Sequence, residues 1–258
     1  MGQAEQNTTE AIAECQRMRT RESLPAPRSS DFERDLDRSL RGSGTESDRI
    51  GQHDEPEIAE RVAMTLRQTY LETTRALVAT VEARDPFTQR HSRTVSLYCE
   101  VIASRLGLSP ARLDSLRTAA LLHDIGKIGI PDVILQKPGP LTKEEFEIVK
   151  RHPGIAIEIL GHASFLSAEL PIILHHHESY DGSGYPYRLA GIDIPFESRI
   201  LAVADAVDTM LSPRSYKRPY TRTHVQDELA AGAGSQFDPE VAQVAHEWLR
   251  SMPHVTED

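Results

Sequence analysis

Apolar residues recur along most of this chain at intervals of three and four, the spacing that places side chains on one face of an α-helix. Val62, Leu66, Tyr70, Leu77 and Val81 follow these steps and predict an amphipathic helix of about six turns beginning near residue 57. This stripe could join the hydrophobic core or pair with a second copy in a homodimer, and the core is the preferred interpretation. No segment alternates with the two-residue period of a β-strand, so the sequence predicts an all-α fold.

Further helices are recognised by their capping residues. Ser109 precedes Pro110 in the arrangement typical of a helix start, and Gly126 is expected to stop the helix that follows. Thr142 and Glu145 have the spacing of a capping box and open a second helix. Helices are expected from about residue 109 to the stop at 126, and over about 142–152, 167–175, 197–211 and 238–250.

Composition divides the chain into regions and excludes some functions. Residues 1–56 are polar, with too few apolar side chains to offset the entropy of ordering, and predict a disordered arm. Residues 57–252 are expected to form one domain, followed by a tail over 253–258. The net charge of -10 argues against duplex nucleic acid as a partner. Cys15 and Cys99 are too few for a disulfide framework, and no apolar run reaches about 20 residues, so we expect a cytoplasmic protein without a membrane span.

Histidines and carboxylates gather at the ends of the predicted helices. A single histidine in such a place is more often a core residue, but burying several imidazoles without partners would be costly, so metal ions are favoured. The candidate ligands are His91, His123, Asp124, His152, His176, His177 and Asp205. They suffice for two ions, which Asp124 or a hydroxide could bridge. His152 is expected at the end of its helix, and His176 and His177 differ by about 100° around a helix, so they are expected to face different ions.

Basic residues and a glycine-containing turn accompany these candidate ligands. Lys127 lies three residues after Asp124 between two glycines, where its ammonium could stabilise charge on a phosphate oxygen, although an ordinary exposed lysine is the plain alternative. Residues 181–186 form a turn directly after the histidine run and are expected to make one wall of the site. Arg214 and Lys217 belong to a basic cluster that could bind a small anion.

Taken in order, these motifs resemble the HD-GYP domain cyclic di-GMP phosphodiesterases, a branch of the HD phosphohydrolase superfamily. The matching segments lie within about residues 70–250 and comprise 83–91, 123–132, 137–142, 152–153, 176–178, 184–186, 199–205, 214–216 and 237–239. The resemblance implies an HD-type helical bundle around a dinuclear metal site, with the seven candidate ligands binding the ions and Lys127 contacting the scissile phosphate. It implies substrate contacts at Tyr185, Arg214 and Lys217. Phe87 stands where members with a third metal carry glutamate, so two ions are expected.

The resemblance also implies a function. The expected reaction is hydrolysis of cyclic di-GMP to linear pGpG, with GMP from a second round left open, in bacterial second-messenger signalling. Diguanylate cyclases are expected partners through the Gly184-Tyr185-Pro186 turn. A mixed histidine and carboxylate ligand set suits iron or manganese and would accept zinc or nickel.

Two alternatives to this function stay open. One is an HD-type phosphohydrolase of another nucleotide, which the Gly-Tyr-Pro turn and the basic pair Arg214 and Lys217 disfavour. The other is a module that binds cyclic di-GMP or a diguanylate cyclase without turnover, which the complete ligand set disfavours.

Overall fold

The structure, a computed structural model, describes residues 88–213 and 219–252, together with individual positions between 58 and 79. The expectations for the arm over 1–56 and the tail over 253–258 therefore lie outside the described residues. The same holds for the proposed substrate contacts at Arg214 and Lys217.

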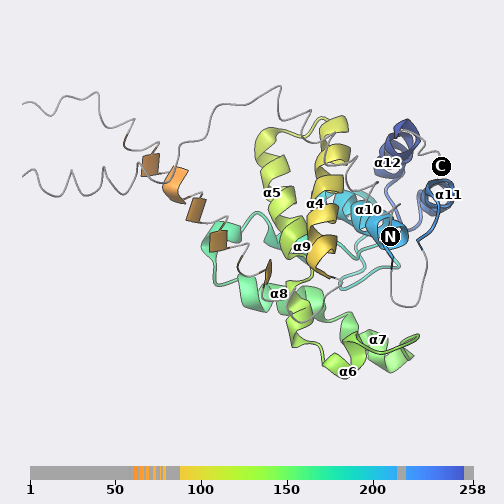
Figure 1. Cartoon of the computed structure of the whole chain (residues 1–258), viewed down its shortest axis with the longest axis horizontal. Helices are drawn as coiled ribbons and strands as arrows, with labels where there is room; N and C mark the ends of the chain where they lie inside the picture. The colour runs from red at the N-terminus through yellow and green to blue at the C-terminus, as the bar shows by residue number, and fades with distance from the viewer. Residues whose placement is uncertain are drawn as a thin grey trace, which may run out of the picture. The chain divides into compact units, whose positions relative to one another are not determined.

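From residue 88 onward the described chain is built from helices joined by short turns (Figure 1). The helices are α4 (Thr88–Arg105), α5 (Pro110–Leu122), α6 (Asp132–Leu135), α7 (Lys143–Val149), α8 (His152–Leu160), α9 (Leu170–Leu174), α10 (Phe196–Leu211), α11 (Arg222–Gly232) and α12 (Pro239–Ser251). Short 3₁₀ helices η1 (Ile125–Gly129), η2 (Ser164–Leu166) and η3 (Gly191–Asp193) lie between them. Residues 88–213 and 219–252 contain no β-strand, so the all-α prediction is confirmed.

The core forms where α4 packs against α5, α10 and α12. Tyr98 and Ile102 of α4, Leu116 of α5, Ile200 of α10 and Trp248 of α12 are all buried. The rings of Tyr98 and Trp248 meet edge to face with centroids 4.9 Å apart, a favourable geometry for an aromatic pair. This packing holds the start of α4, the end of α5 and the middle of α10 in one place, and each of these positions carries candidate ligands.

The close approach of η1 to α8 explains Gly126. The helix α5 ends at Leu122, and Gly126 lies inside η1, so the expectation that Gly126 stops the helix is wrong. A Cβ atom at Gly126 would lie 1.9 Å from the carbonyl oxygen of His152 and 2.7 Å from the amide nitrogen of Ala156. Only glycine fits this contact, which brings the His123-Asp124 segment against the first turn of α8.

The capping box is confirmed at the start of α7. The Thr142 hydroxyl accepts from the Glu145 amide at 3.2 Å, and the Thr142 amide donates to the Glu145 carboxylate at 2.7 Å. The helix it opens ends at Val149, however, and His152 begins α8 instead of ending α7. Proline is tolerated in the first turn of a helix, so Pro153 marks a helix start here. The helix expected from residue 167 likewise begins later, at Leu170.

The described positions between 58 and 73 belong to a unit separate from the bundle and are helical, as expected. The hydroxyls of Thr65, Thr69 and Thr73 each donate to the carbonyl four residues earlier. Val62 and Leu66 are 52% and 66% exposed. Packing of this helix in the core stays a prediction. Pairing in a homodimer stays a prediction.

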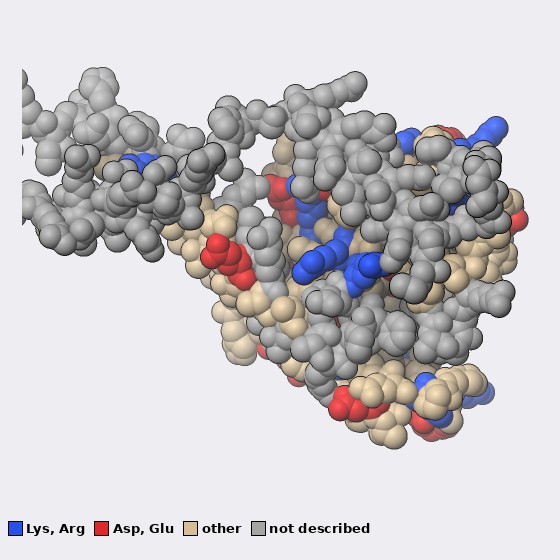
Figure 2. All heavy atoms as spheres, in the orientation of Figure 1, with Lys and Arg blue, Asp and Glu red and all other residues tan. Residues whose placement is uncertain are grey.

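None of the described helices is both long and apolar enough to span a bilayer. On the face shown in Figure 2, the described acidic and basic side chains occur in small separate groups.

Candidate metal centre

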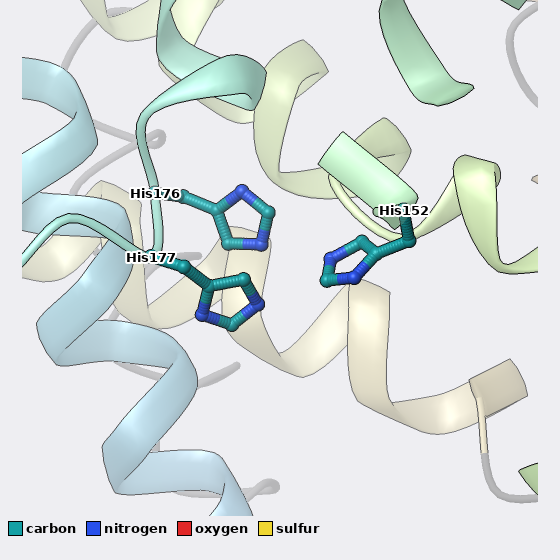
Figure 3. A group of neighbouring side chains, drawn as sticks. All are labelled: His152, His176 and His177. Atoms are coloured by element: carbon teal, nitrogen blue, oxygen red, sulfur yellow. The ribbon is translucent and has the colours of Figure 1, made fainter. Parts of the chain in front are cut away.

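The seven candidate ligands lie together, although they come from segments between residues 91 and 205. They form three overlapping groups in which the ligand atoms are within 4.8 Å of one another. The groups are His91, His123 and Asp205; His123, Asp124 and His176; and His152, His176 and His177. Figure 3 shows the third group, in which the ring from the start of α8 faces the two rings from the turn after α9. Because His123 and His176 are each shared by two groups, the cluster is continuous.

Three of these histidines are held in the same way. The Nδ1 atoms of His123, His152 and His176 lie 2.8, 2.8 and 2.6 Å from the carbonyl oxygen three residues earlier. A carbonyl only accepts, so each Nδ1 carries a hydrogen, and Nε2 is the atom of the neutral ring that offers a lone pair. The accepting carbonyls belong to Ala120, Val149 and Ile173, which lie in the last turns of α5, α7 and α9.

The Nε2 atoms of the same three histidines are buried and have no hydrogen-bond partner. Leaving a buried polar nitrogen without a partner costs free energy, and a metal ion would remove this cost by accepting the lone pair. Burial lowers the pKa of His152, and burial together with the nearby imidazoles lowers the pKa of His176 well below its usual range. Both rings are therefore neutral and ready to coordinate. This part of the cluster fits divalent metal ions.

Asp124 belongs to the second group and lies close to histidines of the other two. Its Oδ2 atom is 3.3 Å from Nε2 of His123 and 3.9 Å from Nε2 of His91, and its Oδ1 atom is 3.6 Å from Nε2 of His152. The ammonium of Lys127 donates to Oδ2 at 2.6 Å. Burial alone would raise the pKa of Asp124, but Lys127 and His123 lower it well below its usual range, so the carboxylate is charged.

His91 is oriented by two carboxylates of α10. Its Nε2 atom lies 3.2 Å from Asp205, and its Nδ1 atom lies 2.6 Å from Asp208. Asp208 is 2% exposed and also accepts from the Ser212 hydroxyl at 3.1 Å. Burial lowers the pKa of His91, but the two carboxylates outweigh it and raise the pKa to about 10. Sequence reasoning gave Asp208 no role, although its position three residues after Asp205 places it on the same helix face.

The geometry corrects the expectation for the neighbouring histidines. Because α9 ends at Leu174, His176 and His177 lie in a turn and the helical angle between them does not apply. Their ring centroids are 4.0 Å apart, and both lie in the group with His152, while His176 also belongs to the group with His123 and Asp124. That they bind different ions stays a prediction. Burial, together with the nearby imidazole of His152, lowers the pKa of His177 to about 3, which leaves it neutral.

The turn after the histidines closes over them, as expected. The Tyr185 ring stacks on His177, with centroids 4.8 Å apart and an interplanar angle of 26°. The buried Glu178 carboxylate accepts from the amides of Tyr187 at 2.7 Å and Leu189 at 3.1 Å, which ties the turn back to the histidine run. Sequence reasoning gave Glu178 no separate role, although it directly follows His177.

His175, which precedes the paired histidines, lies outside the three groups. Its Nδ1 atom is 3.7 Å from Glu178.

A model of the HD domain family matches residues 75–241. This chain belongs to the HD domain family. Most of the bundle and all seven candidate ligands lie within the matched residues 75–241. This segment contains the adjacent pair His123 and Asp124.

Relatives of this HD domain protein support the resemblance to HD-GYP phosphodiesterases. The chain is 44% identical over 170 residues to the cyclic di-GMP phosphodiesterase response regulator RpfG of Xanthomonas campestris, covering 65% of this chain and 45% of the relative. It is 41% identical over 181 residues to the 3'3'-cGAMP-specific phosphodiesterase 2 of Vibrio cholerae, covering 69% of this chain and 35% of that relative. The chain thus spans less than half the length of these relatives.

Solved structures share the HD domain fold at lower identity. Bd1817, an HDG"Y"P protein from Bdellovibrio bacteriovorus, superposes with a TM-score of 0.52 at 22% identity, covering 62% of this chain and 52% of that one. The HD domain of the Listeria monocytogenes phosphodiesterase PgpH, in complex with cyclic di-AMP, superposes with a TM-score of 0.51 at 20% identity, covering 70% of this chain and 100% of that one. At these identities the likeness establishes the fold, and the HD-type bundle expected from the sequence is confirmed.

Proposed function

We propose that this protein is a metal-dependent phosphodiesterase that hydrolyses cyclic di-GMP to linear pGpG. The observation that carries the proposal is the set of three buried Nε2 lone pairs on His123, His152 and His176, which converge beside the charged carboxylate of Asp124. Relatives at 44% identity named cyclic di-GMP phosphodiesterases support the choice of substrate. GMP as a second product is left open.

Two divalent ions would be held by the cluster. His91, His123 and Asp205 would hold one, His152, His176 and His177 the other, and Asp124 would contribute to both. Iron or manganese suits this mixed ligand set, with zinc or nickel as alternatives. When bound, such ions polarise a phosphate and lower the pKa of a water.

Lys127 is proposed to contact the scissile phosphate. The Lys127 side chain is 29% exposed and its ammonium is 2.6 Å from the buried Asp124, so the side chain lies at the edge of the cluster with its position set by that carboxylate. A fixed positive charge at this point would stabilise negative charge as it builds on the phosphate oxygens. Tyr185 would contact the substrate beside His177.

Arg214 and Lys217 are proposed to bind the remote part of the cyclic dinucleotide, either the second phosphate or a guanine. The support is the basic cluster in the sequence. Replacing both residues with alanine should raise KM for cyclic di-GMP more than it affects a small phosphodiester, because remote groups contact only the larger substrate.

The Gly184-Tyr185-Pro186 turn is the proposed contact for diguanylate cyclases, on the support of the family resemblance.

A second candidate substrate is 3'3'-cGAMP. The relative from Vibrio cholerae at 41% identity carries this specificity in its name, and the cluster would act on either cyclic dinucleotide.

Anaerobic purification with elemental analysis, followed by chromatography of products from cyclic di-GMP and 3'3'-cGAMP, tests the proposal. We expect two ions per chain, pGpG as a product, and loss of both metal and turnover in His123→Ala and Asp124→Ala. Cleavage of 3'3'-cGAMP alone would transfer the assignment to that substrate. Full metal content and full activity in both variants would show that His123 and Asp124 are not ligands of a catalytic metal.

A further inference from the structure

Two aromatic rings and a cation extend the candidate metal centre beyond His177. Tyr185 stacks on His177, and Phe146 of α7 meets Tyr185 edge to face, with centroids 6.4 Å apart and an interplanar angle of 83°. The ammonium of Lys150 lies 4.9 Å from the Phe146 ring centroid and 5.7 Å from that of Tyr185. We refer to Phe146, Lys150 and Tyr185 as the aromatic wall.

The helix α7 contributes Phe146 to this wall, and none of its side chains is in the buried core. None of the residues Lys143–Val149 is buried, and Phe146 is 44% exposed. A single exposed phenylalanine is common on protein surfaces and needs no function. Phe146 differs because it is aligned with Tyr185 and the histidine cluster, and because Lys150, one turn later on the same helix face, sets a positive charge over its ring.

We propose that the aromatic wall binds a guanine base of the substrate, with Phe146 stacking on the base and Lys150 donating to its edge. The proposal rests on the function proposed above and adds Phe146 of α7 and Lys150 at the C-terminal end of that helix as determinants of specificity. Aromatic side chains are common stacking surfaces for nucleobases because every base has a π-face. The phosphodiester to be cleaved would then lie at the metal cluster, on the far side of Tyr185 from Phe146.

Lys150 makes this surface selective for guanine over adenine. The O6 and N7 atoms of guanine are adjacent acceptors, whereas adenine presents the acceptor N7 beside the donor N6 amine. An ammonium donates and never accepts, so it complements guanine at both atoms. Lys150 is paired with Glu147 at 2.6 Å, but Glu147 is 67% exposed, and such exposed pairs are weak enough to exchange for a ligand.

The test uses the full-length, metal-loaded protein and compares Phe146→Ala, Phe146→Trp and Lys150→Gln with the wild type. KM and kcat are measured for cyclic di-GMP, and binding of GMP and AMP is measured by calorimetry. Phe165→Ala is the matched control, because Phe165 is 56% exposed in η2, which joins the ends of α8 and α9 that point away from the histidine cluster. Thermal unfolding of each variant checks that the fold is kept.

We expect Phe146→Ala to raise KM by about tenfold or more and to weaken GMP binding to a similar extent, the size found when a base-stacking aromatic is lost. Phe146→Trp should restore both values, since it keeps a ring, and Phe165→Ala should match the wild type. Lys150→Gln should reduce the preference for GMP over AMP.

The outcomes separate this inference from the proposed function. Wild-type KM and GMP binding in both Phe146→Ala and Lys150→Gln would overturn the aromatic wall and leave the hydrolase assignment intact. If the wild type bound GMP but did not cleave cyclic di-GMP, and Phe146→Ala lost GMP binding, the proposed function would be wrong. The proposal that the aromatic wall binds guanine would then still hold. Equal losses of GMP and AMP binding in Lys150→Gln would show a phosphate contact and overturn the guanine assignment.

Discussion

Replacing Gly126 with alanine should separate η1 from α8 and disturb the metal cluster. The added Cβ would lie 1.9 Å from the carbonyl oxygen of His152, whereas real Cβ contacts are essentially never below 3.0 Å, so the two segments must move apart by about 1 Å. The contacts are with backbone atoms, which cannot rotate away as a side chain could. Overpacking of this kind costs about 1–3 kcal/mol in the free energy of unfolding.

For a domain of this size each kcal/mol lowers Tm by about 2–4 °C, so we expect the Tm of metal-free Gly126→Ala to fall by about 6 °C. The activity should fall further than the stability suggests. Asp124 and Lys127 lie on the η1 side of the contact and His152 on the α8 side, and a displacement of about 1 Å can cost roughly 100-fold in rate. Calorimetry, elemental analysis and turnover of a small phosphodiester measure these effects.

Gly154→Ala, in the helix α8 that Gly126 contacts, provides the control. A Cβ at Gly154 would have no atom within 4 Å, so this variant should keep metal and activity and gain up to about 1 kcal/mol from the helix propensity of alanine. Gly126→Ala with the Tm, metal content and turnover of the wild type would refute the argument that the approach of η1 to His152 positions the cluster.

Three other predictions follow from the geometry of the cluster. Asp208→Asn should weaken metal binding about 10- to 100-fold, because the carboxylate orients His91. A competition assay with a chelator measures the metal affinity, and an unchanged affinity would show that Asp208 does not have this role. Lys127→Ala should retain both ions but lose most of kcat with little change in KM, and equal turnover would exclude it from catalysis. The raised pKa of His91 stabilises the metal-free fold, and this stabilisation is complete below the ordinary pKa near 6.5. The Tm of the metal-free protein should therefore fall as the pH rises toward about 10. A Tm that stays constant over this pH range would contradict the pairing of His91 with Asp205 and Asp208.

Several features of this protein follow from its sequence because the signals act over a few residues. The capping box at Thr142 forms as expected, since the atoms that satisfy it lie within one helical turn. The all-α class follows from the period of the apolar residues. The chemical types of the candidate ligands already predicted a metal centre. The contacts of three histidines are local as well, since each Nδ1 atom needs only a carbonyl three residues earlier.

Other features depend on contacts between distant segments. Asp208 orients His91 across 117 positions of the chain, and that pairing exists only because α4 packs against α10. Glycine is required at position 126 because the backbone of His152 lies against it, and the sequence rules for turns do not consider contacts between distant segments. His176 and His177 lie in a turn because α9 ends at Leu174, and Phe146 reaches Tyr185 only because α7 lies beside the histidine turn. Local periodicity carries no information on such approaches, so the tertiary structure alone decided which side chains meet.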